Sequence, residues 1–190
     1  MKFTIPNLLS ILRMGLVPLF IIAVIDGYAF RALMIILIAG VTDVLDGFIA
    51  RVWKQQSLLG TYLDPVADKL LLVSAYVVLS IPSLNRGTEI PLWVTVLVIA
   101  RDVLLVVMAL VLYLAAGIRS FPPSVLSKIN TVLQVATVVL VLLSNTLPQE
   151  RWIDLLAHTA IYGVAVLTLA SGLDYVVRVG RLQPSKASQP

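Results

Sequence analysis

The sequence predicts an all-α polytopic membrane protein with six transmembrane helices, and its composition and the spacing of its apolar stretches support this fold class. Of the 190 residues, 59% are hydrophobic and only 13% are charged, whereas soluble domains carry roughly 25% charged residues. The mean hydropathy is +1.00. A helix that spans a bilayer needs about 20 mostly apolar residues, and the chain offers six such stretches between short polar joints.

The six predicted spans account for nearly the whole chain. In order, we expect them near residues 6–25, 29–52, 61–82, 91–116, 124–145 and 152–177. The joints are too short for a second domain, so we expect one six-span membrane domain over residues 1–181 and a disordered polar tail over residues 182–190. The sequence contains no cysteine, which excludes disulfides and thiolate chemistry.

The net charge of +4 is distributed unevenly among the predicted joints. If the N-terminus is cytoplasmic, most lysines and arginines of the joints fall on the cytoplasmic side, as the positive-inside rule requires. We therefore expect both termini in the cytoplasm, membrane lipids as partners of the basic rim, and no nucleic-acid partner. No Arg- and Ser-rich leader precedes the first span, which favours the inner (plasma) membrane of a bacterium.

Four aspartates lie inside the second and third predicted spans. Asp43 and Asp46 share one face of a helix, as do Asp64 and Asp68, because residues three or four apart lie on the same side. The connection between these spans is short, which makes them antiparallel neighbours whose carboxylates can meet. Each charge costs about 2.5–3.5 kcal/mol at a span centre, so four carboxylates together call for a cation. Oxygen ligands favour magnesium, manganese or calcium, and the single His158 argues against zinc.

Small residues occupy the same faces as the aspartates. Gly47, Ala50 and Gly60 leave the backbone uncovered, so a phosphorylated ligand can approach closely. The alternative is that these residues only permit tight packing between helices.

The aspartates belong to a longer motif. From Asp43 to Asp68 the sequence reads D-V-L-D-G-F-I-A-R, eight further residues, and then G-T-Y-L-D-P-V-A-D. This segment resembles the signature of the CDP-alcohol phosphatidyltransferases, D-x2-D-G-x2-A-R-x8-G-x3-D-x3-D, at every fixed position. The opening I-P-N-L-L-S-I-L-R, from Ile5 to Arg13, is similar to the N-terminal segment of that family. Six spans is also the number expected for the family, so the resemblance covers nearly the whole chain.

The resemblance implies a reaction in which an alcohol attacks the lipid-side phosphorus of CDP-diacylglycerol and CMP leaves. It implies a Mg²⁺ or Mn²⁺ cofactor at the metal-binding aspartates, which are Asp43, Asp46, Asp64 and Asp68. The resemblance also implies that Asp68 is the catalytic residue, which would accept the proton of the attacking hydroxyl. The residues that match positions lining the CDP pocket are Gly47, Ala50, Arg51 and Gly60. The resemblance further implies a homodimer.

Four other residues are candidates for contacts with the acceptor or with a phosphate, namely Asn7, Arg13, Arg101 and Lys128. Asn7 can instead cap a helix, and Arg13 can be an interfacial anchor. Arg101 and Asp102 lie in the middle of the fourth span and point about 100° apart, so we expect separate partners for them. A purely structural pair is the alternative for Arg101. Lys128, near the start of the fifth span, is the stronger candidate for the acceptor's phosphate.

The identity of the acceptor alcohol is predicted from residues of the fourth and fifth spans. The D-P-V-A-D-K form and the N-terminal segment look most like the glycerol-directed branches of the family. The branch that uses glycerol 3-phosphate typically has two basic residues where this sequence has Ala109 and Asn130. A phosphomonoester carries nearly two negative charges and needs those cations, whereas phosphatidylglycerol carries one. We therefore expect phosphatidylglycerol as the acceptor, giving cardiolipin and CMP, with glycerol 3-phosphate as the alternative.

Two rival functions come from other classes. A cation transporter also places carboxylates inside the membrane. Against it, the four aspartates lie on two adjacent spans, and no pair of broken helices repeats along the sequence. The second rival is a noncatalytic assembly protein, but that role does not explain why four carboxylates lie within membrane spans. Metal-dependent release of CMP separates the enzyme from both rivals.

Overall fold

The computed structural model describes residues 5–53, 58–85, 87–116 and 125–181, with side chains at 11–45, 66–85, 87–108, 111, 114 and 125–177. The described backbone is helical, and it contains no strand. Its elements are α1 (Ile5–Ile25), α2 (Ala29–Trp53), α3 (Leu58–Leu79), the short 3-10 helix η1 (Pro82–Leu84), α4 (Leu92–Ala116), α5 (Val125–Thr146) and α6 (Arg151–Arg181). The all-α prediction is confirmed for this part of the chain.

The third predicted span is displaced along the sequence. We expected residues 61–82, but α3 begins at Leu58 and ends at Leu79. Pro82 disfavours a helical conformation in the residue before it and has no N–H to continue the helix. The side-chain amide of Asn85 then donates to the carbonyl oxygens of Leu79 and Ile81, at 3.1 and 2.9 Å. Leu79 O belongs to the last turn of the helix, where carbonyl groups lack partners within the helix, and Ile81 O belongs to the residue before Pro82. The displacement is less than one turn, and the other five helices also agree with the prediction to within about one turn, with the largest difference at the end of α6, which extends to Arg181.

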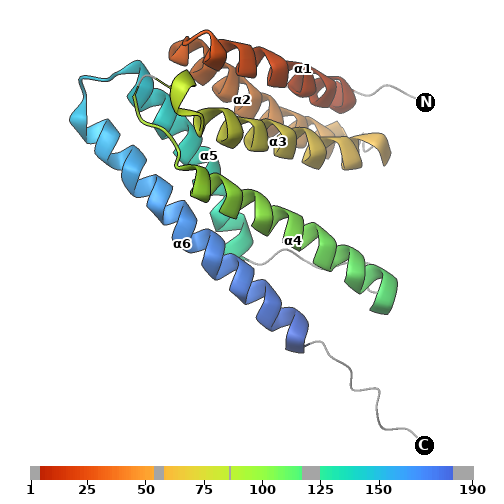
Figure 1. The fold of residues 1–190 in the computed structure, drawn as a ribbon. Helices are drawn as coiled ribbons and strands as arrows, with labels where there is room; N and C mark the ends of the chain where they lie inside the picture. The colour runs from red at the N-terminus through yellow and green to blue at the C-terminus, as the bar shows by residue number, and fades with distance from the viewer. Residues whose placement is uncertain (1–4, 54–57, 86, 117–124, 182–190) are drawn as a thin grey trace, which may run out of the picture.

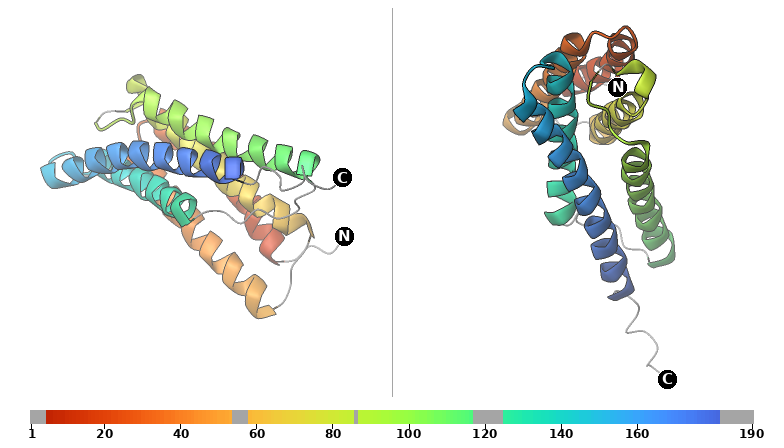
Figure 2. Two further views of the ribbon diagram at one scale, coloured as in Figure 1. Left: turned by 90° about the horizontal axis from the view of Figure 1, so that it is seen from below. Right: turned by 60° about the vertical axis from the view of Figure 1, so that its left-hand side comes forward.

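The helices form two groups that cross at an angle (Figures 1 and 2). α1 packs against both α2 and α3, and α6 packs against both α4 and α5. α5 joins the groups because it also contacts α2. Alanines such as Ala32 and Ala75 are fully buried between the helices, beside Phe20, Tyr76 and Val138. Small side chains in these positions let the helices approach closely.

Much of the outer surface of the described part of the molecule is apolar. Large hydrophobic side chains are more than half exposed on α1, α2, α4, α5 and α6, as at Leu19, Val41, Val106, Val132 and Leu169. A surface of this kind marks contact with a membrane or another protein. Among the residues described with side chains, two helical segments are long and apolar enough to cross a bilayer, Val125–Thr146 and Arg151–Val177, and Ile11–Ile25 is a shorter apolar one.

The turn between α1 and α2 is closed by a glycine. Gly27 has a φ of 76°, in the left-handed region that glycine adopts without strain. The N–H of Gly27 donates to Val24 O and the N–H of Tyr28 donates to Ala23 O, each at 2.9 Å, which is the Schellman pattern of a helix C-terminus. The turn therefore fixes where α2 starts relative to α1.

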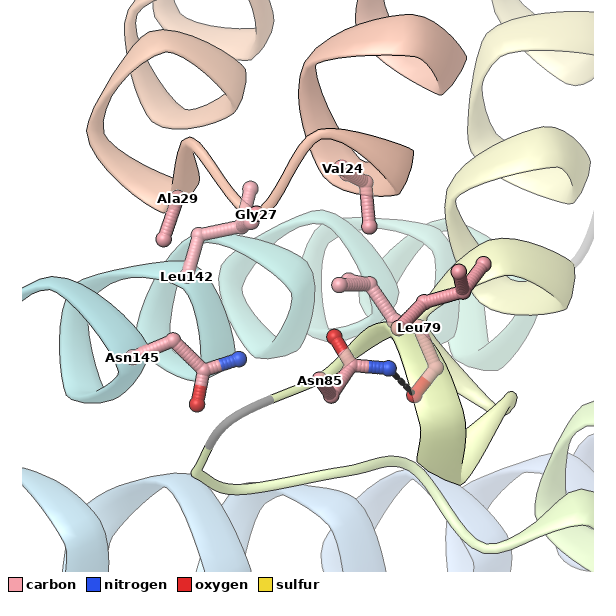
Figure 3. A pocket seen from close by; sticks show the side chains of 8 residues that line it. Val24, Gly27, Ala29, Leu79, Asn85, Leu142 and Asn145 are labelled. Carbon is pink, nitrogen blue, oxygen red and sulfur yellow. Dashed lines mark hydrogen bonds between the residues drawn. The ribbon is translucent and has the colours of Figure 1, made fainter.

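A small cavity of about 60 Å³ lies beside this turn (Figure 3). Asn85 and Asn145 line it together with Gly27 and Leu142. The amide of Asn145 donates to Thr88 O at 3.0 Å, which ties α5 to the segment between η1 and α4. The bond thereby fixes the position of the segment that leads into α4 relative to α5.

Replacing Gly87 with alanine is expected to lower the stability of the protein. A Cβ at this position would lie 2.6 Å from Asn145 Oδ1, so the Asn145 amide must move and lose its bond to Thr88. The loss of such a bond costs about 1 kcal/mol, and the midpoint of thermal unfolding in detergent should fall by about 2–4 °C. Gly172→Ala is the matched control, because no atom lies within 4 Å of its Cβ. A midpoint of Gly87→Ala equal to or above that of the wild type would contradict the prediction, whereas Gly172→Ala should not fall below the wild type, because alanine is favoured over glycine inside a helix.

Candidate active site

A buried arginine joins three helices. Arg13 on α1 is 1% exposed, and its Nη1 lies 2.8 Å from Asp43 Oδ1 on α2. The same nitrogen donates to Asp68 Oδ1 on α3. Both carboxylates are 45% exposed, so the cation is buried while the anions stay accessible. Two carboxylates from different helices thus direct an oxygen to one point, as the sequence predicts for this pair.

These three residues line one side of a cavity of about 550 Å³. Lys69 extends the charged side, and most of the remaining wall is apolar, from α2, α3 and α5. Val44 and Val132 also line the cavity, and each is 70% exposed. The cavity therefore opens onto the apolar outer surface, with charge on one side and hydrocarbon on the others. This arrangement suits a ligand with a phosphorylated headgroup and acyl chains.

A second charged network connects α3 to α4, α5 and α6. Lys69 Nζ lies 2.5 Å from Asp102 Oδ2, and Asp102 Oδ1 lies 2.8 Å from Arg101 Nη1. Arg101 Nη2 donates to Ser127 Oγ and Ser171 Oγ, both at 2.6 Å. Asp102 and Arg101 therefore each have a partner of their own, Lys69 for the first and the two serines for the second, as predicted, but they also contact each other, which was not predicted. The long arginine side chain bends back to its neighbour, because a guanidinium that is 4% exposed needs an adjacent anion.

On α5, the candidate Lys128 and the neutral Asn130 differ in burial. Asn130 stands where the branch that uses glycerol 3-phosphate typically has a basic residue. It is fully buried, and its Oδ1 accepts a hydrogen bond from Thr168 Oγ1 at 3.3 Å. Lys128 is exposed, one turn before Thr131, which lines the cavity. A contact between Lys128 and the acceptor stays a prediction.

Seven predicted site residues lie where the structure does not describe side chains. They are Asn7 on α1, Asp46, Gly47, Ala50 and Arg51 on α2, and Gly60 and Asp64 on α3. Among the described side chains, no three of His, Asp or Glu gather as a metal-binding group. The meeting of four carboxylates therefore stays a prediction.

The described residues fit a divalent metal in their chemistry. Asp43 and Asp68 supply hard oxygen ligands, and both reach the same nitrogen of Arg13, so one cation already lies between them. Mg²⁺ and Mn²⁺ prefer such oxygen ligands. The pair can thus form part of the metal site that the sequence predicts.

Comparison with known proteins decides the family. A family model described as CDP-alcohol phosphatidyltransferase matches residues 3–173. The chain belongs to the CDP-alcohol phosphatidyltransferase family. The match includes both aspartate pairs and the N-terminal segment, so the family predicted from the sequence is confirmed.

Curated relatives in this family carry two kinds of name. Cardiolipin synthase (CMP-forming) of Homo sapiens is 34% identical over 94% of this chain, and the protein of the same name from Streptomyces coelicolor is 36% identical over 94%. CDP-diacylglycerol–glycerol-3-phosphate 3-phosphatidyltransferase of Shigella flexneri is 33% identical over 93%. The alignments cover 62%, 84% and 94% of these three relatives, respectively. The chain thus spans less than two thirds of the length of the human relative.

Sequence reasoning missed the serines of the second network. Ser127 stands in the polar start of α5, which only weakly indicates that it binds a buried charge. Ser171 lies in an apolar stretch of α6, where nothing in the sequence indicates such a role. A buried arginine on a neighbouring helix predicts polar partners of this kind, but it does not say which helix supplies them.

Replacing Arg13 with methionine is expected to destabilise the protein in the absence of metal, because Asp43 and Asp68 then repel each other. We expect a cost of about 2 kcal/mol and a fall of about 4–8 °C in the midpoint of thermal unfolding in detergent with EDTA. Added Mg²⁺ or Mn²⁺ should recover more stability in this variant than in the wild type. Arg31→Met, which removes an exposed cation 4.2 Å from the Tyr28 ring, is the control. Equal shifts in both variants would argue against a paired charge at Arg13.

Proposed function

We propose that this protein transfers a phosphatidyl group from CDP-diacylglycerol to a glycerol-type acceptor and releases CMP, in the synthesis of anionic phospholipids. One observation carries the proposal most directly. The cavity is lined by four charged side chains and otherwise mostly by apolar ones, and it opens onto the apolar outer surface at Val44 and Val132. The charged side chains are those of Arg13, Asp43, Asp68 and Lys69. Membership of the family supports the reaction class. The names of the relatives support the donor and the type of acceptor.

The proposed reaction is a single displacement at phosphorus. The acceptor's hydroxyl oxygen attacks the lipid-side phosphorus, the bond from this phosphorus to the CMP oxygen breaks, and CMP leaves with the bonding electrons. Asp68 accepts the hydroxyl proton, which is the role of a general base. Arg13 orients the Asp68 carboxylate toward the cavity through its ion pair. Because the cavity walls are largely apolar, they limit the access of water that would hydrolyse the donor.

The metal and CDP contacts belong to the same proposal. A bound Mg²⁺ or Mn²⁺ would neutralise charge on the diphosphate and make CMP a better leaving group. The residues proposed to hold it are Asp43, Asp46, Asp64 and Asp68. Gly47, Ala50, Arg51 and Gly60 are proposed to line the CDP pocket. The two glycines and the alanine have little or no side chain, so the nucleotide can approach the backbone there.

Phosphatidylglycerol is the acceptor that we propose, which would make the protein a CMP-forming cardiolipin synthase. Asn130 is neutral and buried against Thr168, which supports an acceptor with only one negative charge. The exposed apolar rim at Val44 and Val132 supports an acceptor that enters from the bilayer. Glycerol 3-phosphate is the alternative, and the name of the Shigella relative favours it. A cation transporter is disfavoured because the chain belongs to a family of phosphatidyltransferases.

We further propose that all six helices span the membrane, with both termini and the active site on the cytoplasmic side of a bacterial inner membrane. The exposed hydrophobic side chains on each group of helices support contact with lipid. A homodimer remains a prediction from the family resemblance.

An assay with a single acceptor tests the proposed function. Detergent-purified protein is given CDP-diacylglycerol, Mg²⁺ or Mn²⁺, and either phosphatidylglycerol or glycerol 3-phosphate, and CMP release is followed. We expect release with phosphatidylglycerol, and a fall in kcat of about 10²–10⁴ in Asp68→Asn because the general base is lost. Asp26→Asn, an exposed carboxylate in the turn between α1 and α2, should retain wild-type kcat.

The outcomes separate the acceptors. Release with glycerol 3-phosphate alone would contradict phosphatidylglycerol as the acceptor and support the alternative. No release with either acceptor would contradict transfer to a glycerol-type alcohol.

A further inference from the structure

Lys69 shares the cavity with the proposed catalytic base. It directly follows Asp68 on α3, and both side chains line the cavity. Neighbouring residues of a helix point about 100° apart, so α3 directs a carboxylate and an ammonium group to adjacent parts of one space. Lys69 is 43% exposed, which leaves its ammonium accessible to a ligand. Among the described residues that line the cavity, it is the one lysine.

The ammonium of Lys69 is held by a buried carboxylate. Asp102 is 12% exposed, and its Oδ2 lies 2.5 Å from Lys69 Nζ. Its other oxygen pairs with Arg101, which Ser127 and Ser171 anchor from two further helices. A lysine side chain otherwise samples many rotamers, and ordering it upon ligand binding costs conformational entropy. Asp102 therefore pre-organises Lys69 at the cavity wall.

The charges of the two networks differ in sign. Arg13 lies between Asp43 and Asp68, so these three side chains together carry one net negative charge. Lys69, Asp102 and Arg101 together carry one net positive charge, because Arg101 already balances Asp102. An anion bound beside Lys69 would neutralise this positive charge, and a phosphate oxygen accepts charge-assisted hydrogen bonds well.

The chemistry of a glycerol-type acceptor matches this arrangement. Its attacking hydroxyl and its phosphate stand at opposite ends of one three-carbon unit, both in phosphatidylglycerol and in glycerol 3-phosphate. A hydroxyl placed at Asp68 therefore brings the phosphate near the neighbouring part of the cavity. We propose that Lys69 binds the phosphate of the acceptor and that Asp102 is the residue that positions its ammonium group. This inference rests on the proposed function and holds for either acceptor.

Steady-state kinetics on Lys69 variants tests the inference. The acceptor that supports CMP release in the wild type and CDP-diacylglycerol are varied in turn. Lys69→Met should raise the KM of the acceptor about 10- to 100-fold, the worth of a hydrogen bond between charged groups, and leave the KM of CDP-diacylglycerol unchanged. Lys69→Arg, which keeps the charge, should recover most of the loss. Arg31→Met is the control for removal of a cation far from the cavity.

Variants of Asp102 test its positioning role. Asp102→Asn keeps the shape but not the charge, and we expect a smaller rise in the KM of the acceptor than in Lys69→Met, with recovery in Asp102→Glu. In the double variant, Asp102→Asn should add nothing to Lys69→Met, because both changes remove the same contact. If Asp102 had a purely structural role, its effect would add to that of Lys69→Met in the double variant, and Asp102→Asn would also lower kcat and thermal stability.

Three results would overturn the inference. A rise in the KM of CDP-diacylglycerol in Lys69→Met would assign the lysine to the donor's diphosphate. Unchanged constants in both Lys69 variants, or a rise confined to Lys128→Met, would remove Lys69 from the acceptor site. If Lys69→Met does not fold, loss of acceptor affinity in Asp102→Asn at unchanged CDP-diacylglycerol affinity still supports the inference, and unchanged affinity in that variant overturns it. Wild-type protein without any CMP release would overturn the proposed function together with this inference.

Discussion

The buried guanidinium of Arg13 is the constraint on which the site depends. A cation that is 1% exposed is stable only beside anions, and its two carboxylates come from α2 and α3. The ion pairs therefore fix α1 against both neighbours at the level of the cavity. Because Asp43 and Asp68 are themselves about half exposed, the same contacts hold their oxygens where a ligand can reach them. Fold and site share one set of interactions.

A second set of polar contacts connects α3 to the other three helices α4, α5 and α6. Lys69 and Asp102 connect α3 to α4, and Arg101 continues the network to serines on α5 and α6. The two networks meet at Asp68 and Lys69, which are adjacent in the chain. The cavity is thus lined by Arg13, Asp43 and Asp68 of the first network and by Lys69 of the second, and the two networks carry net charges of opposite sign. This arrangement can receive a cation and an anionic lipid headgroup together.

Much of this could be predicted from the sequence, because apolar runs of span length and helical periodicity are local properties. The six helices and the meeting of Asp43 with Asp68 follow from them. The early end of α3 was missed because the effect of Pro82 and the Asn85 cap outweighed a continuing apolar run. The contact between Arg101 and Asp102 depends on a rotamer, and the serine partners of Arg101 depend on packing between helices distant in the chain. Neither the contact nor the serine partners can be predicted from the helical periodicity of the sequence.

Binding of Mn²⁺, followed by electron paramagnetic resonance, tests most directly whether the carboxylates around Arg13 form the catalytic metal site. Wild-type protein and the double variant Asp43→Asn with Asp68→Asn would be titrated in detergent, each with and without CDP-diacylglycerol. We expect that the wild type binds Mn²⁺, that CDP-diacylglycerol tightens this binding, and that the double variant loses both effects. Equal Mn²⁺ affinity in a folded double variant would place the metal elsewhere and contradict the account.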